Sequence, residues 1–272
     1  MNIGTIVAAA PIAVGLAILP APGWSDDKDS RLATGIQDNL CLVEEAYNQE
    51  AGVVQHINCL QRQEGDWFYN FTQEWPLGSQ TNQFSYTLPY AWLRSEGQLE
   101  EGLGDIMLNY RRQVLYEGRN TPAFAPRLSL ILPTGDEETG LGSGSLGYEV
   151  LLPVSKIVSN RITLHANVGM TSYFDVQGHQ PTSYLLGGAF IYALTRDFNL
   201  MVESLGAWEE SVADAGFVQR ETSFTVSPGA RYAVNLSAGQ VVLAAGAPIQ
   251  MMDGSEPDYG VFLYLSFEHR FK

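Results

Sequence analysis

The chain has 272 residues, and 30 Asp and Glu residues against 15 Lys and Arg residues give it a formal net charge of −15. This balance excludes a nucleic-acid surface, because phosphate binding needs clustered cationic side chains. Hydrophobic residues make up 45% of the chain and aromatic residues 11%, which argues against intrinsic disorder. Only one apolar run, residues 3–19, approaches the length of a membrane-spanning helix. A helical multi-pass membrane protein is therefore also excluded.

The N-terminus has the outline of a secretory signal peptide. Residues 1–23 form an apolar, alanine-rich run without a charged residue, and a polar stretch begins at Ser25. Ala21 and Gly23 place small residues at the two positions that signal peptidase inspects, so cleavage is predicted before Trp24. The alternative is a retained membrane anchor, because the apolar run is at the short end for a span.

The segment between the signal peptide and the first strand, residues 24–52, leaves three interpretations open. Ile36, Leu40, Val43 and Tyr47 stand at helical spacing, which is typical of a short amphipathic helix. The segment is accordingly interpreted as a short periplasmic helix, as a plug that enters a lumen, or as a loosely ordered tail.

The chain contains two cysteines, Cys41 and Cys59. In an oxidising compartment they can form a disulfide that ties the segment before the first strand to that strand. The alternative is a pair of buried free thiols.

Alternation of apolar and polar residues dominates the chain from residue 53 onward. Ile162, Leu164, Ala166, Val168 and Met170, for example, alternate with polar or small neighbours, a pattern typical of a strand with one apolar and one polar face. The pattern predicts about twelve strands, an even number that fits an antiparallel bacterial barrel. The predicted ranges are 53–63, 67–77, 83–93, 104–116, 122–133, 145–155, 160–173, 182–195, 197–209, 219–234, 238–250 and 258–271.

The connections between these strands alternate between short and long, as the turns and loops of an outer-membrane barrel do. The shorter set is 77–82, 117–121, 155–160, 195–197 and 235–237. The longer set, which carries most of the acidic residues, is 94–103, 134–144, 174–181, 210–218 and 251–257. The short turns and both chain termini are therefore predicted to face the periplasm, and the acidic loops the outside.

Aromatic residues share single faces of neighbouring strands. Trp67, Tyr69, Phe71 and Trp75 lie on one face of one predicted strand, and in a barrel such residues collect at the membrane interfaces. A soluble β-sandwich would instead bury this face against a second sheet, so a secreted sandwich is the competing fold.

If the apolar faces meet lipid, the alternate faces line the lumen and bring charged side chains inside. Mixed charge across a pore selects and orients polar solutes, whereas the alternative is a structural web of ion pairs that fills the barrel. The candidate luminal and selectivity residues are Arg111, Arg127, Glu149, Arg161, His165, Glu203, Glu221, Arg231, Glu268 and Arg270.

Other chemistry has weaker support. Asp136, Glu137 and Glu138 stand in a glycine-rich loop and offer ligands for a divalent cation shared with lipopolysaccharide. Their spacing does not match an EF-hand loop, so a solvated acidic loop is the favoured interpretation. Among the four histidines none stands in a His-x-Ser context, and the chain has no Gly-x-Ser-x-Gly motif, so a catalytic role as an outer-membrane hydrolase is disfavoured. No catalytic residue, cofactor or metal site is predicted.

Several segments resemble the outer-membrane β-barrel family named for the meta-cleavage pathway of phenol degradation. The resemblance covers roughly residues 42–272. It rests on Glu45-Ala46-Tyr47-Asn48-Gln49-Glu50, Gly52-Val53-Val54-Gln55-His56, Phe71-Thr72-Gln73-Glu74-Trp75-Pro76, Phe84-Ser85-Tyr86-Thr87-Leu88-Pro89-Tyr90, Leu132-Pro133-Thr134-Gly135-Asp136 and Gly142-Ser143-Gly144-Ser145.

The resemblance implies a transporter-like barrel that admits aromatic or other small hydrophobic compounds. Together with the strand pattern it predicts an all-β protein, an antiparallel transmembrane β-barrel at residues 53–272, in the outer membrane of a Gram-negative bacterium. Expected partners are membrane lipid and lipopolysaccharide, the barrel assembly machinery and a small-molecule solute. The competing function is a non-transporting structural or adhesion barrel whose acidic loops bind cations.

The signal-peptide interpretation is checked by intact-mass spectrometry of the protein purified from outer membranes. We expect a mature N-terminus at Trp24, since the small residues at Ala21 and Gly23 suit signal peptidase. A mature protein that retains Met1 would support the membrane-anchor interpretation instead.

Overall fold

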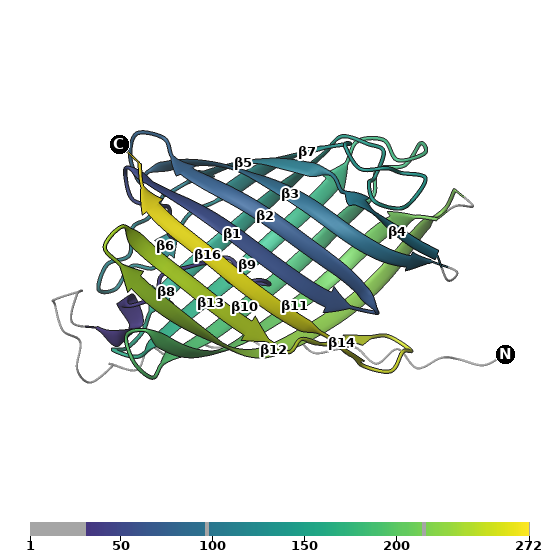
Figure 1. Cartoon of the computed structure of the whole chain (residues 1–272). Helices are drawn as coiled ribbons and strands as arrows, with labels where there is room; N and C mark the ends of the chain where they lie inside the picture. Colours follow the sequence, from purple (N-terminus) through teal and green to yellow (C-terminus); the bar gives the residue numbers. More distant parts are fainter. Residues whose placement is uncertain (1–30, 96–97, 214–215, 272) are drawn as a thin grey trace.

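In the computed structural model, residues 31–95, 98–213 and 216–271 are described, and they form one antiparallel β-barrel (Figure 1). The predicted signal peptide, residues 1–23, lies outside the described residues. The strands of the barrel are β1 (Val53–Gln63), β2 (Asp66–Pro76), β3 (Asn82–Ser95), β5 (Ile106–Arg112), β7 (Arg127–Leu132), β8 (Gly147–Ile157), β9 (Ile162–Tyr173), β10 (Thr182–Ala193), β11 (Phe198–Val212), β12 (Val218–Leu236), β13 (Gly239–Gly246) and β16 (Val261–Arg270).

The barrel closes because its first strand pairs with its last. Val53 of β1 is opposite Arg270 of β16, and Arg62 is opposite Val261. The remaining strands pair with their neighbours around the ring, and β11 pairs with β12 to complete it. Closure gives each of the twelve barrel strands a partner on both sides over the described residues, as a membrane-spanning sheet requires. The prediction of a twelve-stranded antiparallel barrel is confirmed, and the sandwich alternative is wrong.

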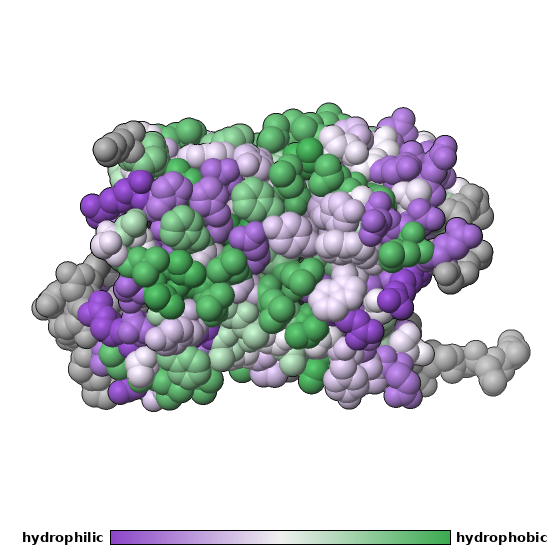
Figure 2. All heavy atoms as spheres, in the orientation of Figure 1, coloured by the Kyte–Doolittle hydropathy of each residue, from purple (hydrophilic) through white to green (hydrophobic). Residues whose placement is uncertain are grey.

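Burial separates the two faces of the sheet as the alternation predicts. On β9, Val168 is 52% exposed, whereas the inward residues His165 and Asn167 are 4% and 2% exposed. Exposed leucines lie at equivalent outward positions on other strands, among them Leu130, Leu186, Leu243 and Leu263. In Figure 2 apolar residues dominate the middle of the visible face and hydrophilic residues gather toward its ends. This distribution is the apolar band that faces lipid in an outer-membrane barrel.

Two predicted strands are shorter than expected. The range 104–116 forms a strand only to Arg112, and the range 122–133 begins its barrel strand only at Arg127. Between them Leu115 bridges Phe124, next to the two-residue strand β6 (Ala123–Phe124), which pairs with β8. Pro122 and Pro126 interrupt this stretch, and proline cannot donate to a sheet ladder.

Three further short strands extend the barrel at the end that carries the long loops. β4 (Gln98–Leu103) pairs with β3, and β14 (Ile249–Met252) pairs with both β12 and β15 (Asp258–Tyr259). The predicted strand 238–250 therefore ends at Gly246 and resumes as β14. Pro248 lies at this break, and it lacks the N–H that a continuous strand would use.

The described part of the N-terminal segment, residues 31–52, lies against the inner face of the barrel. Its only helical element is a 3-10 turn, η2 (Leu32–Thr34), so the helical interpretation of its apolar spacing is wrong. The apolar residues instead pack individually against the wall: Ile36 and Val43 are 1% and 0% exposed and share a core with Ile191 and Phe262. Among the described residues, no helix is long and apolar enough to span a membrane.

A charge placed on the outward face tests the orientation of the strands. We expect Val168→Arg to lower the free energy of unfolding in lipid vesicles by about 2–4 kcal/mol, because it exposes a cation to the apolar band. Urea titration monitored by tryptophan fluorescence measures the change. Glu256→Arg, in an exposed loop, is the control that stays close to wild type. Equal stability of the two variants would contradict the lipid-facing assignment of β9.

Candidate functional site

The interior of the barrel collects most of the charged residues predicted to line it, but it does not leave them free. Six of these residues are buried or mostly buried, and they contact the N-terminal segment or one another: Arg111, Arg127, Glu149, His165, Glu203 and Arg231. Glu268 is half-buried on the inner face of β16. Exposed at strand ends are Arg161, Glu221 and Arg270.

The two most deeply buried arginines bind carbonyl groups of the N-terminal segment. Arg111, on β5, donates from Nη1 to the Glu45 carbonyl at 3.2 Å and from Nη2 to the Tyr47 carbonyl at 2.8 Å. Arg231, on β12, donates from Nη1 to the Asp38 carbonyl at 2.8 Å and from Nη2 to that of Ile36 at 3.0 Å. Each guanidinium therefore satisfies two main-chain acceptors, which its planar fork of donors suits.

Acceptors on the wall match the N–H groups of the same segment. One carboxylate oxygen of Glu203, on β11, accepts from the amides of Leu42 at 2.9 Å and Val43 at 3.0 Å. The side-chain amide of Asn167, on β9, accepts from the Glu44 N–H at 2.7 Å and donates to the Glu44 carbonyl at 2.8 Å. Both main-chain groups of Glu44 are thus hydrogen-bonded, as they would be in a sheet.

A cluster of ion pairs joins the segment to β5, β7 and β8. Arg127 lies 2.5 Å from Glu149 and 3.1 Å from Glu44 of the segment. Arg111 lies 3.7 Å from Glu44 and 3.8 Å from Glu74 on β2. These groups compensate one another's charge inside the barrel.

The sequence pattern missed the acidic and amide residues on which the segment depends. Asp38, 2% exposed, accepts hydrogen bonds from Gln55 at 2.6 Å, from Tyr264 at 2.5 Å and from Ser266. Gln113 likewise accepts from the Asn48 N–H at 3.0 Å. The alternating pattern of β1 and β16 does place Gln55, Tyr264 and Ser266 on the inner face. Nothing in the sequence indicates which distant residue each of these side chains meets.

Glu45, in the same segment, shows the electrostatic cost of this burial. Desolvation and the neighbouring Asp38 carboxylate raise the pKa of Glu45 to about 8, against the opposing charges of Arg231 and Arg111. The side chain therefore carries a proton at neutral pH, which spares the lumen one buried negative charge.

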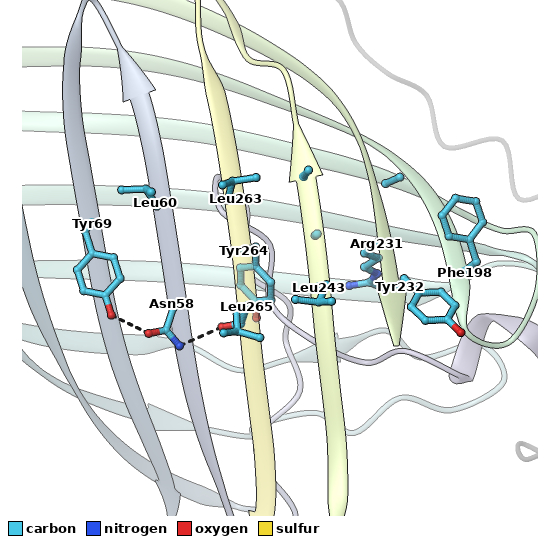
Figure 3. A pocket seen from close by; sticks show the side chains of 13 residues that line it. Asn58, Leu60, Tyr69, Phe198, Arg231, Tyr232, Leu243, Leu263, Tyr264 and Leu265 are labelled. Atoms are coloured by element: carbon cyan, nitrogen blue, oxygen red, sulfur yellow. Dashed lines mark hydrogen bonds between the residues drawn. The ribbon is translucent and has the colours of Figure 1, made fainter. Parts of the chain in front are cut away.

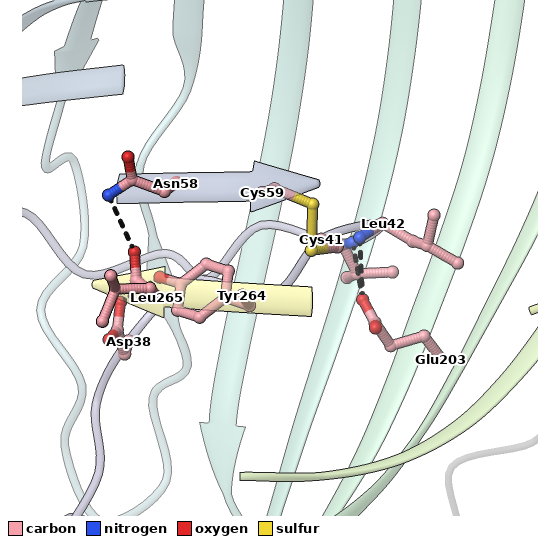
Figure 4. Close-up of a disulfide and its surroundings, with 9 residues drawn as sticks. Asp38, Cys41, Leu42, Asn58, Cys59, Glu203, Tyr264 and Leu265 are labelled. Carbon is pink, nitrogen blue, oxygen red and sulfur yellow. Dashed lines mark hydrogen bonds between the residues drawn. A yellow bond between two sulfur atoms is a disulfide. The ribbon is translucent and has the colours of Figure 1, made fainter. Parts of the chain in front are cut away.

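A disulfide joins the segment to the wall. Cys41 is bonded to Cys59 of β1, with Cα atoms 6.0 Å apart. Figure 4 shows this bond beside Leu42, whose main-chain N–H donates to Glu203. Of the two alternatives that the sequence left open, the disulfide is the one formed. The disulfide fixes the middle of the segment to β1, directly before Leu42 and Val43, which bind Glu203 of β11.

The outer wall carries an apolar hollow of about 500 Å³ over β1, β16, β13 and β12 (Figure 3). Leucines frame it, and the small residues Ala230 and Ala245 leave its floor open. A polar residue at its edge, Asn58, donates to the Leu265 carbonyl at 3.2 Å and accepts from the Tyr69 hydroxyl at 2.6 Å. Because the hydrogen bonds of the Asn58 side chain are satisfied within the wall, this residue leaves the hollow an apolar surface. Such a surface suits a lipid chain or a hydrophobic solute.

The acidic loop at residues 134–144 folds back on itself through main-chain hydrogen bonds. Asp136 uses its carboxylate to accept from the Glu138 N–H at 2.9 Å, and its carbonyl accepts from the N–H groups of Leu141 at 2.9 Å and Gly142 at 3.1 Å. Over the described residues, no group of three or more His, Cys, Asp or Glu side chains is arranged to hold a metal ion.

The family model described as "Putative MetA-pathway of phenol degradation" matches residues 51–246. The chain belongs to this family. The match begins next to β1 and covers most of the barrel, which confirms the predicted resemblance. No curated protein matches the chain.

Solved structures support the fold. A crystal structure of an outer membrane channel from Pseudomonas putida F1 is similar with a TM-score of 0.62 and 11% identity, covering 82% of this chain and 97% of that one. Two further solved structures are less similar. The KdgM porin has a TM-score of 0.49 and 10% identity, covering 80% of this chain and 99% of that one. The CymD monoaromatic hydrocarbon channel has a TM-score of 0.42 and 6% identity, covering 82% of this chain and 89% of that one. Barrel closure and the apolar outer band place the protein in a Gram-negative outer membrane.

Removing the Glu203 carboxylate tests whether the wall holds the segment by its main chain. We expect Glu203→Ala to raise amide exchange of Leu42 and Val43 by about tenfold or more, because a hydrogen bond to a charged group contributes about 1.5–3 kcal/mol. Hydrogen exchange with mass spectrometry on the oxidised protein measures this, and Glu256→Ala is the control. Unchanged protection in a folded Glu203→Ala barrel would mean that the disulfide and apolar packing alone hold the segment.

Proposed function

We propose that the protein is an outer-membrane channel for small molecules and that residues 31–52 of its N-terminal segment close the periplasmic half of the lumen. The observation that carries the proposal is the matching of wall side chains to the main chain of the segment. Main-chain groups of one or two segment residues are bound by each of Arg111, Arg231, Glu203 and Asn167. A barrel whose lumen was filled by wall side chains alone would have no separate segment for these side chains to bind.

The luminal charges have two roles in this proposal. In the closed state Arg111, Arg231 and Glu203 hold the segment. When the segment moves, the same side chains are exposed to the lumen, where mixed charge creates a field that selects among polar solutes. Selectivity is thereby coupled to opening, because the residues that would face a solute are the ones that release the segment.

The proposed cargo is a small hydrophobic or aromatic compound. Membership of a family described by the degradation of phenol supports this class. The apolar hollow in the outer wall supports it as well, because a hydrophobic solute that leaves the barrel sideways enters a surface of the same polarity. Lipopolysaccharide around the acidic loops and assembly machinery that reads β16 are the further partners that we propose.

Catalysis is not part of the proposed function. The only Ser–His pair that we find within hydrogen-bonding distance in the described residues joins Ser155 Oγ to His165 Nδ1 at 2.6 Å. Ser155 is 0% exposed and its hydroxyl accepts from the Ala46 N–H at 2.7 Å. The pair therefore holds the N-terminal segment, and the serine is not available to attack a substrate.

Single-channel recording in planar bilayers tests the proposal. The mature protein, with its disulfide intact, is compared with a variant in which Cys41→Ser, Cys59→Ser and Glu203→Ala together loosen the segment. We expect rare, small openings for the wild type and frequent, larger ones for the variant, because the variant lacks the covalent tie and two main-chain hydrogen bonds.

The controls separate opening from misfolding. Glu256→Ala leaves the lumen untouched and is expected to record as wild type, and heat-modifiable migration in gels verifies that each barrel is folded. Equal conductance of the wild type and the loosened variant would contradict closure by the segment. Silence of both folded proteins, together with no uptake of small neutral solutes into vesicles, would favour a structural barrel.

A further inference from the structure

A second cavity, of about 360 Å³, lies at the loop end of the lumen. Its wall is formed by inward residues of the first three strands, including Gln61 of β1, Phe68 and Asn70 of β2, and Ala91 of β3. Its cover is the tip of the long loop between β7 and β8, residues 140–143. The residues that line it include none of the N-terminal segment, so the cavity lies on the outer side of the proposed plug.

The cover is held in place by one carboxylate. Asp105, just before β5, accepts from the Gly135 N–H at 3.0 Å and from Ser143 twice, from its N–H at 2.8 Å and its Oγ at 2.7 Å. The loop approaches so closely that a Cβ atom at Gly142 would lie 2.7 Å from Asp105 Oδ1. The loop tip is thus built to lie over the cavity, and it presents Leu141 to it.

The lining indicates what the cavity would bind. Phe68, Pro89, Leu93, Leu141 and Tyr173 supply apolar surfaces, and the side-chain amides of Gln61 and Asn70 supply hydrogen-bonding groups. The volume is at the small end of ligand pockets, so it suits a molecule well below drug size.

Charge narrows the ligand class further. The residues of the lining contain no Lys, Arg or His, and their single charged member is the Asp105 carboxylate. The covering loop adds Asp136, Glu137 and Glu138 at its surface. A ligand carboxylate would be desolvated beside this negative charge without a cation to compensate it.

We infer that this cavity is the entry site of the channel and that it takes a neutral, single-ring molecule bearing a hydroxyl group while rejecting ring carboxylates. The inference rests on the proposed function, since it names the class of solute that the same lumen admits. The ring would pack between Phe68 and Leu141, and the hydroxyl would reach the amides of Gln61 or Asn70.

A matched pair of probes tests the inference: benzyl alcohol, which is neutral, and benzoate, which has the same ring and a negative charge. Saturation-transfer NMR titrations use the mature protein in lipid nanodiscs, with empty nanodiscs as the baseline. We expect benzyl alcohol to bind at least about tenfold more tightly than benzoate, because the site offers the carboxylate no cationic partner.

Two variants locate the binding. Ala91→Trp fills the cavity and is expected to weaken benzyl alcohol binding by about tenfold or more, while Ala166→Trp, at an exposed position of β9, makes the same change on the lipid face and leaves it unaltered. Gln61→Lys adds a cation to the lining and is expected to bring benzoate binding close to that of benzyl alcohol.

The outcomes separate this inference from the channel proposal. Equal binding of the two probes by the wild type, or unchanged benzyl alcohol binding in folded Ala91→Trp, would overturn the entry site even if the loosened-segment variant conducts. Selective benzyl alcohol binding that Ala91→Trp abolishes would support the site even if no variant conducts, in which case only the channel proposal fails.

Discussion

Main-chain polar groups that are removed from water must find hydrogen-bonding partners, and this constraint shapes both the wall and the interior of the protein. In the wall it requires a closed sheet, which the pairing of β1 with β16 provides. In the interior it applies to an irregular segment without a sheet partner. There the donors and acceptors come from wall side chains, among them the buried Glu203 and Arg231.

The need of this segment for hydrogen-bonding partners explains why so many polar residues occupy the inner face of the barrel. A lumen filled with water could leave Asn167 or Arg111 solvated, and a lumen filled by apolar packing would have no use for them. Here they bond a chain segment, and apolar residues of the segment, among them Ile36 and Val43, pack between them. Specific polar matching together with the Cys41–Cys59 bond gives the segment one position in the barrel.

The barrel is thereby divided along its axis into regions of different chemistry. The half near the short turns holds the charged network and the segment, whereas the loop end holds a small cavity covered by Leu141. The outer wall adds an apolar hollow over β13 and β16. A solute would therefore first meet a partly apolar region whose lining has no cationic side chain, and it would meet the charged network only when the segment moves. This order suits an uncharged molecule.

The sequence alone determined the strands, their number and their inward and outward faces, because a period of two is a local property that lipid on one side imposes directly. It could not determine what the inner face contacts. Helical spacing at Ile36, Leu40, Val43 and Tyr47 suggested a helix, yet the segment is irregular because distant side chains satisfy its main chain. The pairing of Arg231 with the Ile36 carbonyl spans most of the chain, so only the closed barrel, which brings all its strands around one lumen, decided which residues meet.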